Sequence, residues 1–266
     1  MAMIARTITM DDGTDIFVEI HGRDGPPIVF VAGLGDNRLT WAPQVRYLSD
    51  RFRIILIDNR GTGKSATPPG PYSTQRMAED AHQVIANLGF GPVNAIGISM
   101  GGAICQHWAL RYPADINQLV LSSTWAAPDV LTGVLFDHWK GLADRGDRQA
   151  LIESLLLFCF SPDYLTEHPE TVQEFIAGET LNLEGFSPAA EACRDHDTIE
   201  SLFRVPHRTL VTIGEHDILI RPALSMAMAN ELQERRIEIM PTGHMPSWEL
   251  PDVYSELVAE FFVGPH

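Results

Sequence analysis

The stretch Val93-Asn94-Ala95-Ile96-Gly97-Ile98-Ser99-Met100-Gly101-Gly102-Ala103 decides the fold of this chain. Its first half is a short apolar run typical of a buried strand, and the residues after it carry apolar side chains at helical spacing. The turn between them contains Gly-x-Ser-x-Gly, with Gly97 and Gly101 on either side of Ser99. So tight a turn from strand to helix leaves no room for neighbouring side chains, so we expect both glycines to be sterically required.

A serine at such a turn has a strained backbone, and the strain lifts its hydroxyl clear of the sheet. The first N–H groups of the following helix have no partner within that helix, so the N–H of Met100 points toward a negative charge developing near the serine. Gly-x-Ser-x-Gly also occurs by chance in glycine-rich loops, but there it lacks a strand before it and a helix after it. We therefore interpret Ser99 as a nucleophile.

Short apolar strands alternate with amphipathic helices on both sides of this stretch. The expected strands cover residues 4–10, 15–20, 27–31, 53–57, 93–98, 118–122, 209–213 and 236–240. The first two form a hairpin through Asp11-Asp12-Gly13, and helices are expected near Thr40 and at 74–88, 222–232 and 251–262. Such alternation implies right-handed crossovers and predicts an α/β fold with a mostly parallel eight-stranded sheet flanked by helices.

The alternation stops in the middle of the chain, where no strand is apparent and helices are expected at 131–140, 149–160 and 170–181. We interpret residues 126–205 as a helical cap inserted into a core domain made of residues 1–125 and 206–266. Its length and aromatic content favour a lid over a pocket rather than surface decoration. Candidate pocket residues are Gly33, Trp125, Phe136, Trp139 and Met245.

The composition argues against several classes of protein. A net charge of −16 opposes binding to nucleic acid or to an anionic membrane. No apolar run approaches the ~20 residues of a spanning helix, and the N-terminus lacks the pattern of a signal peptide. The three cysteines are scattered without metal-ligand spacing. We expect a cytoplasmic protein without cofactor or metal, and a homo-oligomer is compatible with the sequence.

A second glycine-rich segment, Arg60-Gly61-Thr62-Gly63-Lys64-Ser65, contains the Gly-Lys-Ser ending of a phosphate-binding loop. That motif requires a glycine five positions before Gly63, where this chain has Asp58. It also requires a helix that starts at the lysine, and Ala66-Thr67-Pro68-Pro69-Gly70 cannot start one. Nucleotide binding is therefore disfavoured.

A serine hydroxyl needs a base within hydrogen-bond reach, and that base needs an orienting carboxylate. In a parallel sheet these groups meet in the loops after the carboxyl ends of the strands. Asp217 follows the seventh expected strand and His244 the eighth, so they are the expected acid and base. His216 precedes the last strand and would leave His244 without a role. Asp129 is the fallback carboxylate, and Glu215 is a weaker one.

Together these motifs resemble the α/β-hydrolase fold superfamily, and the resemblance covers nearly the whole chain. The family commonly has Asp-x-Arg-Gly-x-Gly-x-Ser after its fourth strand, as at residues 58–65 here. Its oxyanion loop is usually His-Gly-x-x-Gly, and the corresponding Ala32-Gly33-Leu34-Gly35 nominates the N–H of Leu34 as the partner of Met100. Ala32 departs from that pattern, which affects the contacts of the loop but not a backbone donor.

The resemblance implies a cofactor-independent serine hydrolase that cleaves a small ester or lactone through an acyl-enzyme, with Ser99, Asp217 and His244 as its triad. The size, the helical cap and the missing His-Gly are similar to small carboxylesterases and 3-oxoadipate enol-lactonases. The same framework serves hydrolases that cleave C–C bonds of vinylogous diketones, which generally hold a substrate carboxylate with a polar or cationic cap residue. Candidates for that role are Arg145, Arg148, Arg194 and Arg204. A slow-turnover receptor on the same fold is the alternative from another class.

Overall fold

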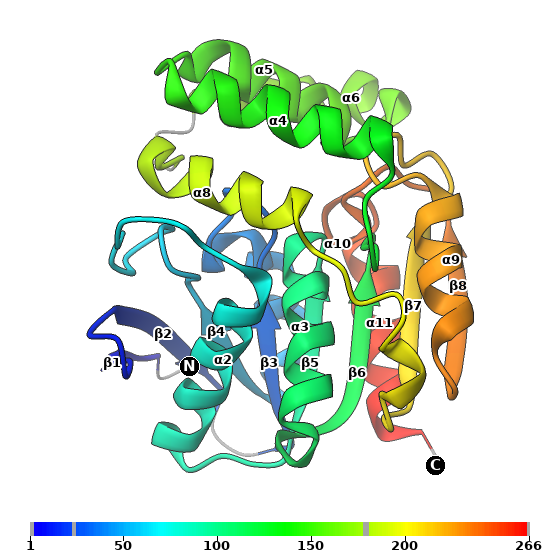
Figure 1. Ribbon diagram of the computed structural model, residues 1–266. Coiled ribbons are helices and arrows are strands. Elements are labelled where there is room, and N and C mark those ends of the chain that lie inside the picture. Colours follow the sequence, from blue (N-terminus) through cyan, green and yellow to red (C-terminus); the bar gives the residue numbers. More distant parts are fainter. Residues whose placement is uncertain (1–2, 23–24, 178–180, 265–266) are drawn as a thin grey trace.

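The computed structural model describes residues 3–22, 25–177 and 181–264. Its centre is an eight-stranded sheet with helices on both faces (Figure 1). Strands β1 to β8 are, in chain order, Ile4–Thr9, Asp15–His21, Pro27–Val31, Arg53–Ile57, Val93–Ile98, Ile116–Ser122, Thr209–Gly214 and Arg235–Met240. Their order across the sheet is β1-β2-β4-β3-β5-β6-β7-β8. β2 pairs antiparallel with β1 and β4, and the pairings from β4 to β8 are parallel. The predicted fold class is confirmed.

The helices of the core cover both faces of the sheet (Figure 1). One face packs against α2 (Thr74–Leu88), α3 (Met100–Arg111) and α9 (Pro222–Glu231), and the other against α1 (Ala42–Leu48) and α11 (Pro251–Val263), which follows a short α10 (Pro246–Glu249). The start of α2 is as predicted, because Ser73 Oγ accepts the N–H of Arg76 at 3.0 Å. Over the described residues, no helix is both long enough and apolar enough to cross a membrane.

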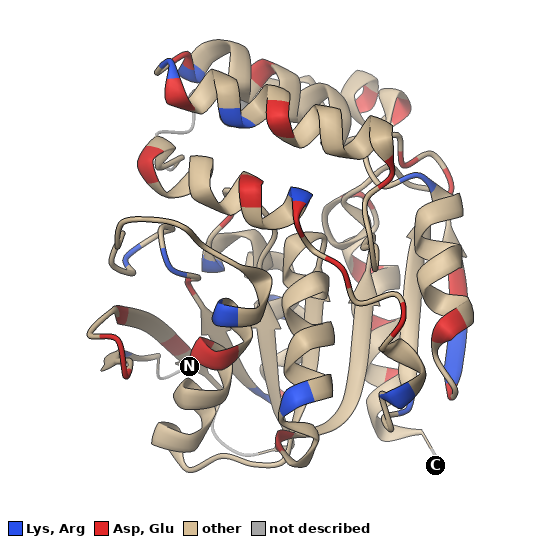
Figure 2. Cartoon of the chain, in the orientation of Figure 1, with Lys and Arg blue, Asp and Glu red and all other residues tan. Residues whose placement is uncertain are grey.

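The central strands are buried on both faces, as their unbroken apolar sequences predict. In β3, Val29 and Val31 join the core beneath α2 and α3, while Ile28 and Phe30 join the core beneath α1 and α11. This division follows the two-residue period of a strand. Figure 2 shows the charged residues on helices, loops and outer strands, and β3, β5, β6 and β7 contain none. The loops at the carboxyl ends of these strands therefore place their few polar groups next to strands that carry no charge.

The turn after β5 is closed by contacts between backbone atoms. Ser99 has φ 54° and ψ −122°, a left-handed conformation that a side chain rarely adopts. A Cβ on Gly97 would lie 2.2 Å from the carbonyl oxygen of Gly101, and a Cβ on Gly101 would lie 2.1 Å from that of Val31. Both glycines are therefore required by close approach, as the sequence predicts.

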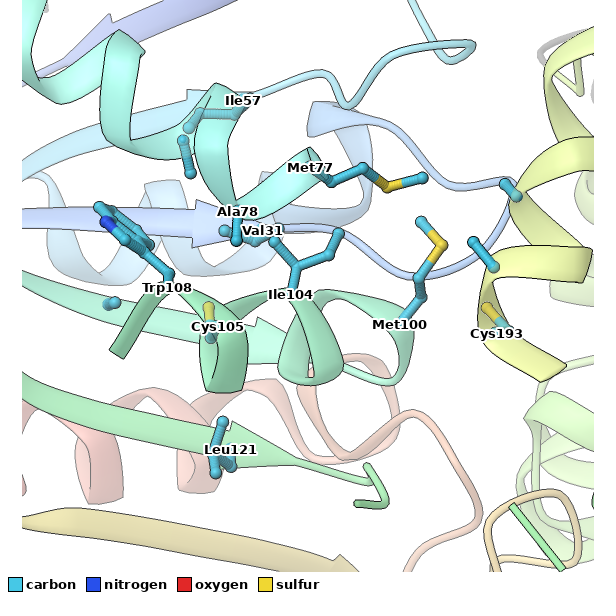
Figure 3. Close-up of a cluster of buried hydrophobic side chains, with 14 of the residues drawn as sticks. Val31, Ile57, Met77, Ala78, Met100, Ile104, Cys105, Trp108, Leu121 and Cys193 are labelled. Atoms are coloured by element: carbon cyan, nitrogen blue, oxygen red, sulfur yellow. The ribbon is translucent and has the colours of Figure 1, made fainter. Parts of the chain in front are cut away.

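The residue after Ser99 anchors this turn in the core. Figure 3 shows Met100 beside Ile104 in a cluster that also contains Met77 of α2 and Cys193 of a later helix, α8 (Leu183–Arg194). Met77, Met100 and Ile104 come from the core helices, and Cys193 comes from the cap. Met100 is fully buried. Burial of Met100 fixes the start of α3, so its N–H keeps one direction relative to Ser99.

Between β6 and β7 the described chain forms helices only: α4 (Val130–Asp144), α5 (Arg148–Cys159), α6 (Pro162–Glu167), α7 (Pro169–Ala177) and α8, followed by one short turn of helix. We call α4 to α8 the cap. The expected helices at 131–140 and 149–160 match α4 and α5, while the expected helix at 170–181 matches α7 but runs into residues 178–180, outside the described chain.

Two cap helices, α6 and α8, are missing from the sequence prediction, and each has a Ser-Pro pair: Ser161-Pro162 at the start of α6 and Ser187-Pro188 within α8. In α6 the pair starts the helix: Ser161 Oγ accepts the N–H of Tyr164 at 3.2 Å, and Pro162 occupies the first turn, where no N–H is needed. In α8 Pro188 lies inside the helix. That helix is buried between α4 and the core (Figure 1), and this packing outweighs the lost hydrogen bond.

The cap is seated on two core loops by close contacts. A Cβ on Gly185 of α8 would lie 2.1 Å from the carbonyl oxygen of Gly61, in the loop after β4. A Cβ on Gly35, in the loop after β3, would meet Leu181 and Phe186 at 2.8 Å each. Residues of the cap therefore press directly on the loop that the sequence assigns to the oxyanion hole.

The Gly-Lys-Ser segment folds as a closed loop around a carboxylate. Asp58 Oδ2 accepts the N–H of Lys64 at 2.8 Å, and Ser65 Oγ donates to the carbonyl oxygen of Asp58 at 2.6 Å. The next helix, α2, starts only at Thr74. The Lys64 N–H, which a phosphate would need, is thus taken by Asp58, and the helix that follows the loop does not start at the lysine.

Alanine at Gly101 is expected to destabilise the protein strongly, because its Cβ would overlap the backbone of Val31. Overpacking of this kind lowers the free energy of unfolding by about 2 kcal/mol or more. Gly133→Ala in α4 is the matched control: its Cβ meets nothing within 4 Å, so helix propensity should raise stability by about 0.5–1 kcal/mol. Urea unfolding of both variants measures the difference, and equal midpoints would contradict the close-approach account.

Candidate active site

Ser99 lies at the carboxyl end of β5, as the residue that precedes α3. It is 7% exposed, and that exposure faces a small cavity of about 30 Å³ that it shares with His244. Residue 99 has no side-chain hydrogen bond to the helix it precedes. The hydroxyl is therefore available to a reacting group in the cavity.

Asp217 and His244 meet as the sequence predicts. His244 Nδ1 lies 2.7 Å from Asp217 Oδ2, and both residues are 2% exposed. The other oxygen, Asp217 Oδ1, accepts the N–H groups of Leu219 and Ile220 at 2.9 Å each. These backbone donors hold the carboxylate in one orientation. Because Nδ1 of His244 faces Asp217, its Nε2 is directed away from Asp217, on the side of the cavity that His244 lines.

The alternative acid and base candidates lie elsewhere. Glu215 and His216 are both exposed to solvent. Asp129 caps α4 by accepting the N–H of Thr132 at 2.9 Å, and its other oxygen pairs with Arg221. That pair and the backbone bond lower the pKa of Asp129 below its ordinary value, the backbone bond being the larger cause. Asp217 is thus the carboxylate that contacts the buried histidine.

Two backbone N–H groups face the site without a partner. Among the described residues, neither Leu34 N nor Met100 N has a hydrogen-bond acceptor. Leu34 lines the cavity of Ser99, and a Cβ on the adjacent Gly33 would lie 3.4 Å from the Cβ of Ser99. Met100 is the first residue of a twelve-residue helix whose dipole is positive at this end. Both donors are suited to an anionic oxygen next to Ser99.

The cavity of Ser99, called the inner cavity below, adjoins a larger outer pocket of about 270 Å³ beneath the cap. The two spaces share Leu34, Asp36, Leu155, Cys159 and Met245. The inner cavity is otherwise lined by Gly33, Ile98, Phe136, Trp139 and Leu219, and the outer one by residues that include Thr40, Ile152, Phe160, Leu181 and Trp248. The combined space is narrow, mostly apolar and bounded by both core loops and cap helices.

Four of the five predicted pocket residues line the inner cavity: Gly33, Phe136, Trp139 and Met245. Trp125 is not among the residues that line either cavity. It lies in the loop after β6, which ends at Ser122, and is fully buried, with its ring centroid 5.2 Å from that of Phe136. Its side chain therefore continues the core and supports Phe136 from behind, away from both cavities.

None of the four arginines considered for a substrate carboxylate lines the two cavities. Arg148 donates to the carbonyl oxygen of Leu181, and Arg194 is held by three acids, Asp137, Glu191 and Asp195. Arg145 borders a separate groove, and Arg204 is exposed. The expected cationic anchor for a substrate carboxylate is therefore not provided by these side chains.

Two residues of the site gave no signal in the sequence. Glu249 Oε1 accepts the N–H groups of Gly243 and Ser161 at 2.9 and 3.1 Å, and Glu249 Oε2 accepts the Ser161 hydroxyl at 2.5 Å. This carboxylate ties the loop that carries His244 to the start of α6. Asp36, the second, lines both cavities.

Burial raises the pKa of Asp36 to about 6, although the charge of His244 and a hydrogen bond from the Thr40 hydroxyl partly offset that rise. Burial, reinforced by the nearby carboxylates of Asp36, Asp217 and Glu249, also holds the pKa of the Cys159 thiol well above its ordinary value. Cys159 is therefore a neutral thiol at neutral pH. Within the described parts of the chain, no group of three His, Cys, Asp or Glu side chains is placed to hold a metal ion.

Comparison with known proteins matches residues 26–251 to the family model of the alpha/beta hydrolase fold. Two relatives span nearly the same length: a putative carbamate hydrolase RutD from Agrobacterium fabrum is 28% identical, with 92% of this chain and 97% of the relative covered, and 3-oxoadipate enol-lactonase 2 from Acinetobacter baylyi is 25% identical, with 95% and 94% covered.

Solved structures resemble this one closely. The enol-lactonase from Burkholderia xenovorans LB400 superposes with a TM-score of 0.91 at 26% identity, covering 97% of this chain and 99% of that one. A thermophilic esterase from Thermogutta terrifontis gives 0.87 at 27% identity, with 98% of each chain covered. The sheet order, the turn at Ser99 and these matches agree, and the chain belongs to the α/β-hydrolase fold family.

Proposed function

We propose that this protein is a serine hydrolase that cleaves a small carboxylic ester or lactone. Ser99 Oγ attacks the substrate carbonyl while His244 takes its proton, and His244 then passes that proton to the leaving alkoxide. Water, activated by His244, releases the acyl group from Ser99. The observation that carries the proposal is the buried hydrogen bond from His244 to Asp217, 2.7 Å long, beside a cavity that His244 shares with Ser99.

The role of Asp217 follows from its fixed orientation. Because both of its oxygens are engaged, it holds one tautomer of His244, with the proton on Nδ1, and it stabilises the imidazolium that forms during attack. The N–H groups of Leu34 and Met100 bind the oxyanion of the tetrahedral intermediate. Each such donor contributes roughly 2.7–4 kcal/mol to the stability of the transition state.

The relatives support a hydrolase that acts on an ester, a lactone or a carbamate. The narrow apolar lining supports a small and largely apolar substrate. We further propose that residues 126–205 act as a lid over a core of residues 1–125 and 206–266, since the cap supplies Phe136, Trp139, Leu155 and Cys159 to the wall of the inner cavity.

A C–C hydrolase is less well supported, because none of the four arginines considered for a substrate carboxylate lines the cavities. The receptor alternative has one observation in its favour. Val130, Leu131 and Val134 of α4 are 85%, 62% and 60% exposed, which is an apolar surface on the cap. A receptor would turn over slowly, so the rate of hydrolysis separates the two functions.

Nitrophenyl esters of increasing acyl length should be hydrolysed with a kcat above about 1 per second. The small volume of the pocket predicts an optimum at short chains. Ser99→Ala should lose about three orders of magnitude in kcat or more, because the nucleophile is gone. Undiminished turnover by Ser99→Ala would refute the mechanism, and a burst of one equivalent followed by near silence would favour the receptor.

Asp217→Asn should fold normally, because the amide oxygen can still accept the N–H groups of Leu219 and Ile220. Its kcat should fall by roughly 10³–10⁴, because the amide favours the wrong tautomer of His244. Asp129→Asn is the matched control: asparagine keeps the cap of α4, and its kcat should change less than about twofold. Equal losses in both variants, measured with a single ester substrate, would show that Asp217 does not act on His244.

A further inference from the structure

Asp36 stands where the inner cavity meets the outer pocket, since it lines both. Its Oδ2 atom lies 3.6 Å from the position that a Cβ on Gly33 would take, and the Cβ of Ser99 lies 3.4 Å from the same position. The Asp36 carboxyl oxygen is therefore at most 7.0 Å from the Cβ of Ser99, and both residues line the inner cavity. The proposed hydrolytic mechanism assigns Asp36 no step.

The charged and titratable groups around Asp36 come from three elements. His244, from the loop after β8, attracts the carboxylate, and Cys159, at the end of α5, is a neutral thiol. The Thr40 hydroxyl donates a hydrogen bond from the short helix Arg38–Trp41. Arg38 itself is turned away, because its guanidinium is held by Glu19 and Asp58 at 2.7 and 2.9 Å.

Apart from His244 and Asp36, no charged side chain is among the described residues that line the two cavities. His244 is neutral when it acts as a base. A substrate group that enters this space thus meets a carboxylate and apolar walls, with no lysine or arginine to balance the charge. Asp36 is therefore the one carboxylate on the described walls of the two cavities.

We propose that Asp36 is the specificity-determining residue that excludes carboxylate-bearing substrates, so that the accepted substrates are uncharged esters or lactones. The inference rests on the proposed function and refines it. A substrate carboxylate bound in the outer pocket would lie near the Asp36 carboxylate. Two like charges several ångströms apart in a partly buried site weaken binding by about tenfold to a hundredfold. An uncharged ester of the same shape binds without this repulsion.

The Asp36→Asn variant removes the negative charge of the side chain and keeps its shape. Its amide oxygen can still accept the Thr40 hydroxyl, and its size matches that of aspartate. Two substrates complete the comparison: the mono-nitrophenyl ester of adipic acid, and its uncharged analogue in which an isopropyl group replaces the free carboxylate. They have the same leaving group and nearly the same shape. The measured quantity is the ratio of kcat/KM for the uncharged ester to that for the anionic ester.

At pH 8 the wild type should show a large ratio, and Asp36→Asn should lower it by about tenfold or more, chiefly by raising kcat/KM for the anionic ester. Asp129→Asn, which removes the same charge from the outer surface, should leave the ratio unchanged. An unchanged ratio in Asp36→Asn would overturn the proposal.

A pH series on the wild type gives a second test that needs no variant. The pKa of Asp36 is raised to about 6, so the carboxyl is ionised at pH 8 and largely protonated at pH 5.5, where the substrate carboxylate, with a pKa of about 4.3, stays ionised. The ratio should therefore fall as the pH falls, while any effect of pH on the hydrolytic step itself cancels because it affects both substrates. A ratio that stays flat in the wild type would contradict the role of Asp36.

Failure of the inference is distinguishable from failure of the proposed function. If the wild type hydrolyses the uncharged ester and Ser99→Ala does not, the serine mechanism stands whatever the ratio does. If neither ester is hydrolysed faster by the wild type than by Ser99→Ala, the proposed function fails and this inference fails with it.

Discussion

Contact between backbone atoms around Ser99 is the constraint on which the rest of the site depends. The turn brings Gly97 against Gly101 and Gly101 against Val31, at separations that leave no space for a methyl group. This packing fixes the end of β5, the start of α3 and the end of β3 relative to one another. The strained φ of Ser99 and the free N–H of Met100 follow from the same geometry.

The cap extends this constraint to the substrate. Leu181 and Phe186 press on Gly35, and Glu249 joins the loop of His244 to Ser161, so the loops that carry the oxyanion donor and the base both contact the cap. Charges interact more strongly in such a partly buried pocket than in bulk water, because the effective dielectric constant is lower there. That is why a single carboxyl group, Asp36, can dominate the choice of substrate.

Much of the fold could be predicted from sequence, because its signals are local. The apolar runs of the strands and the glycines around Ser99 act over a few residues, and Asp217 and His244 were located by the strand ends that precede them. The rest depends on contacts between distant segments. Helix α8 forms despite Pro188 because it is buried on both sides, and Trp125 packs behind Phe136. The proposed role of Asp36 depends on cap residues that line the same pocket but are far from it in the sequence.

The central claim is that Ser99 is a nucleophile activated by His244, and a covalent probe tests it most directly. A fluorophosphonate should add one phosphonyl group per chain, found by mass spectrometry on the peptide that contains Ser99. Labelling should be lost in Ser99→Ala and slowed by orders of magnitude in His244→Gln, because the imidazole accepts the proton of the attacking hydroxyl. A label on another residue, or a rate that His244→Gln leaves unchanged, would contradict the account.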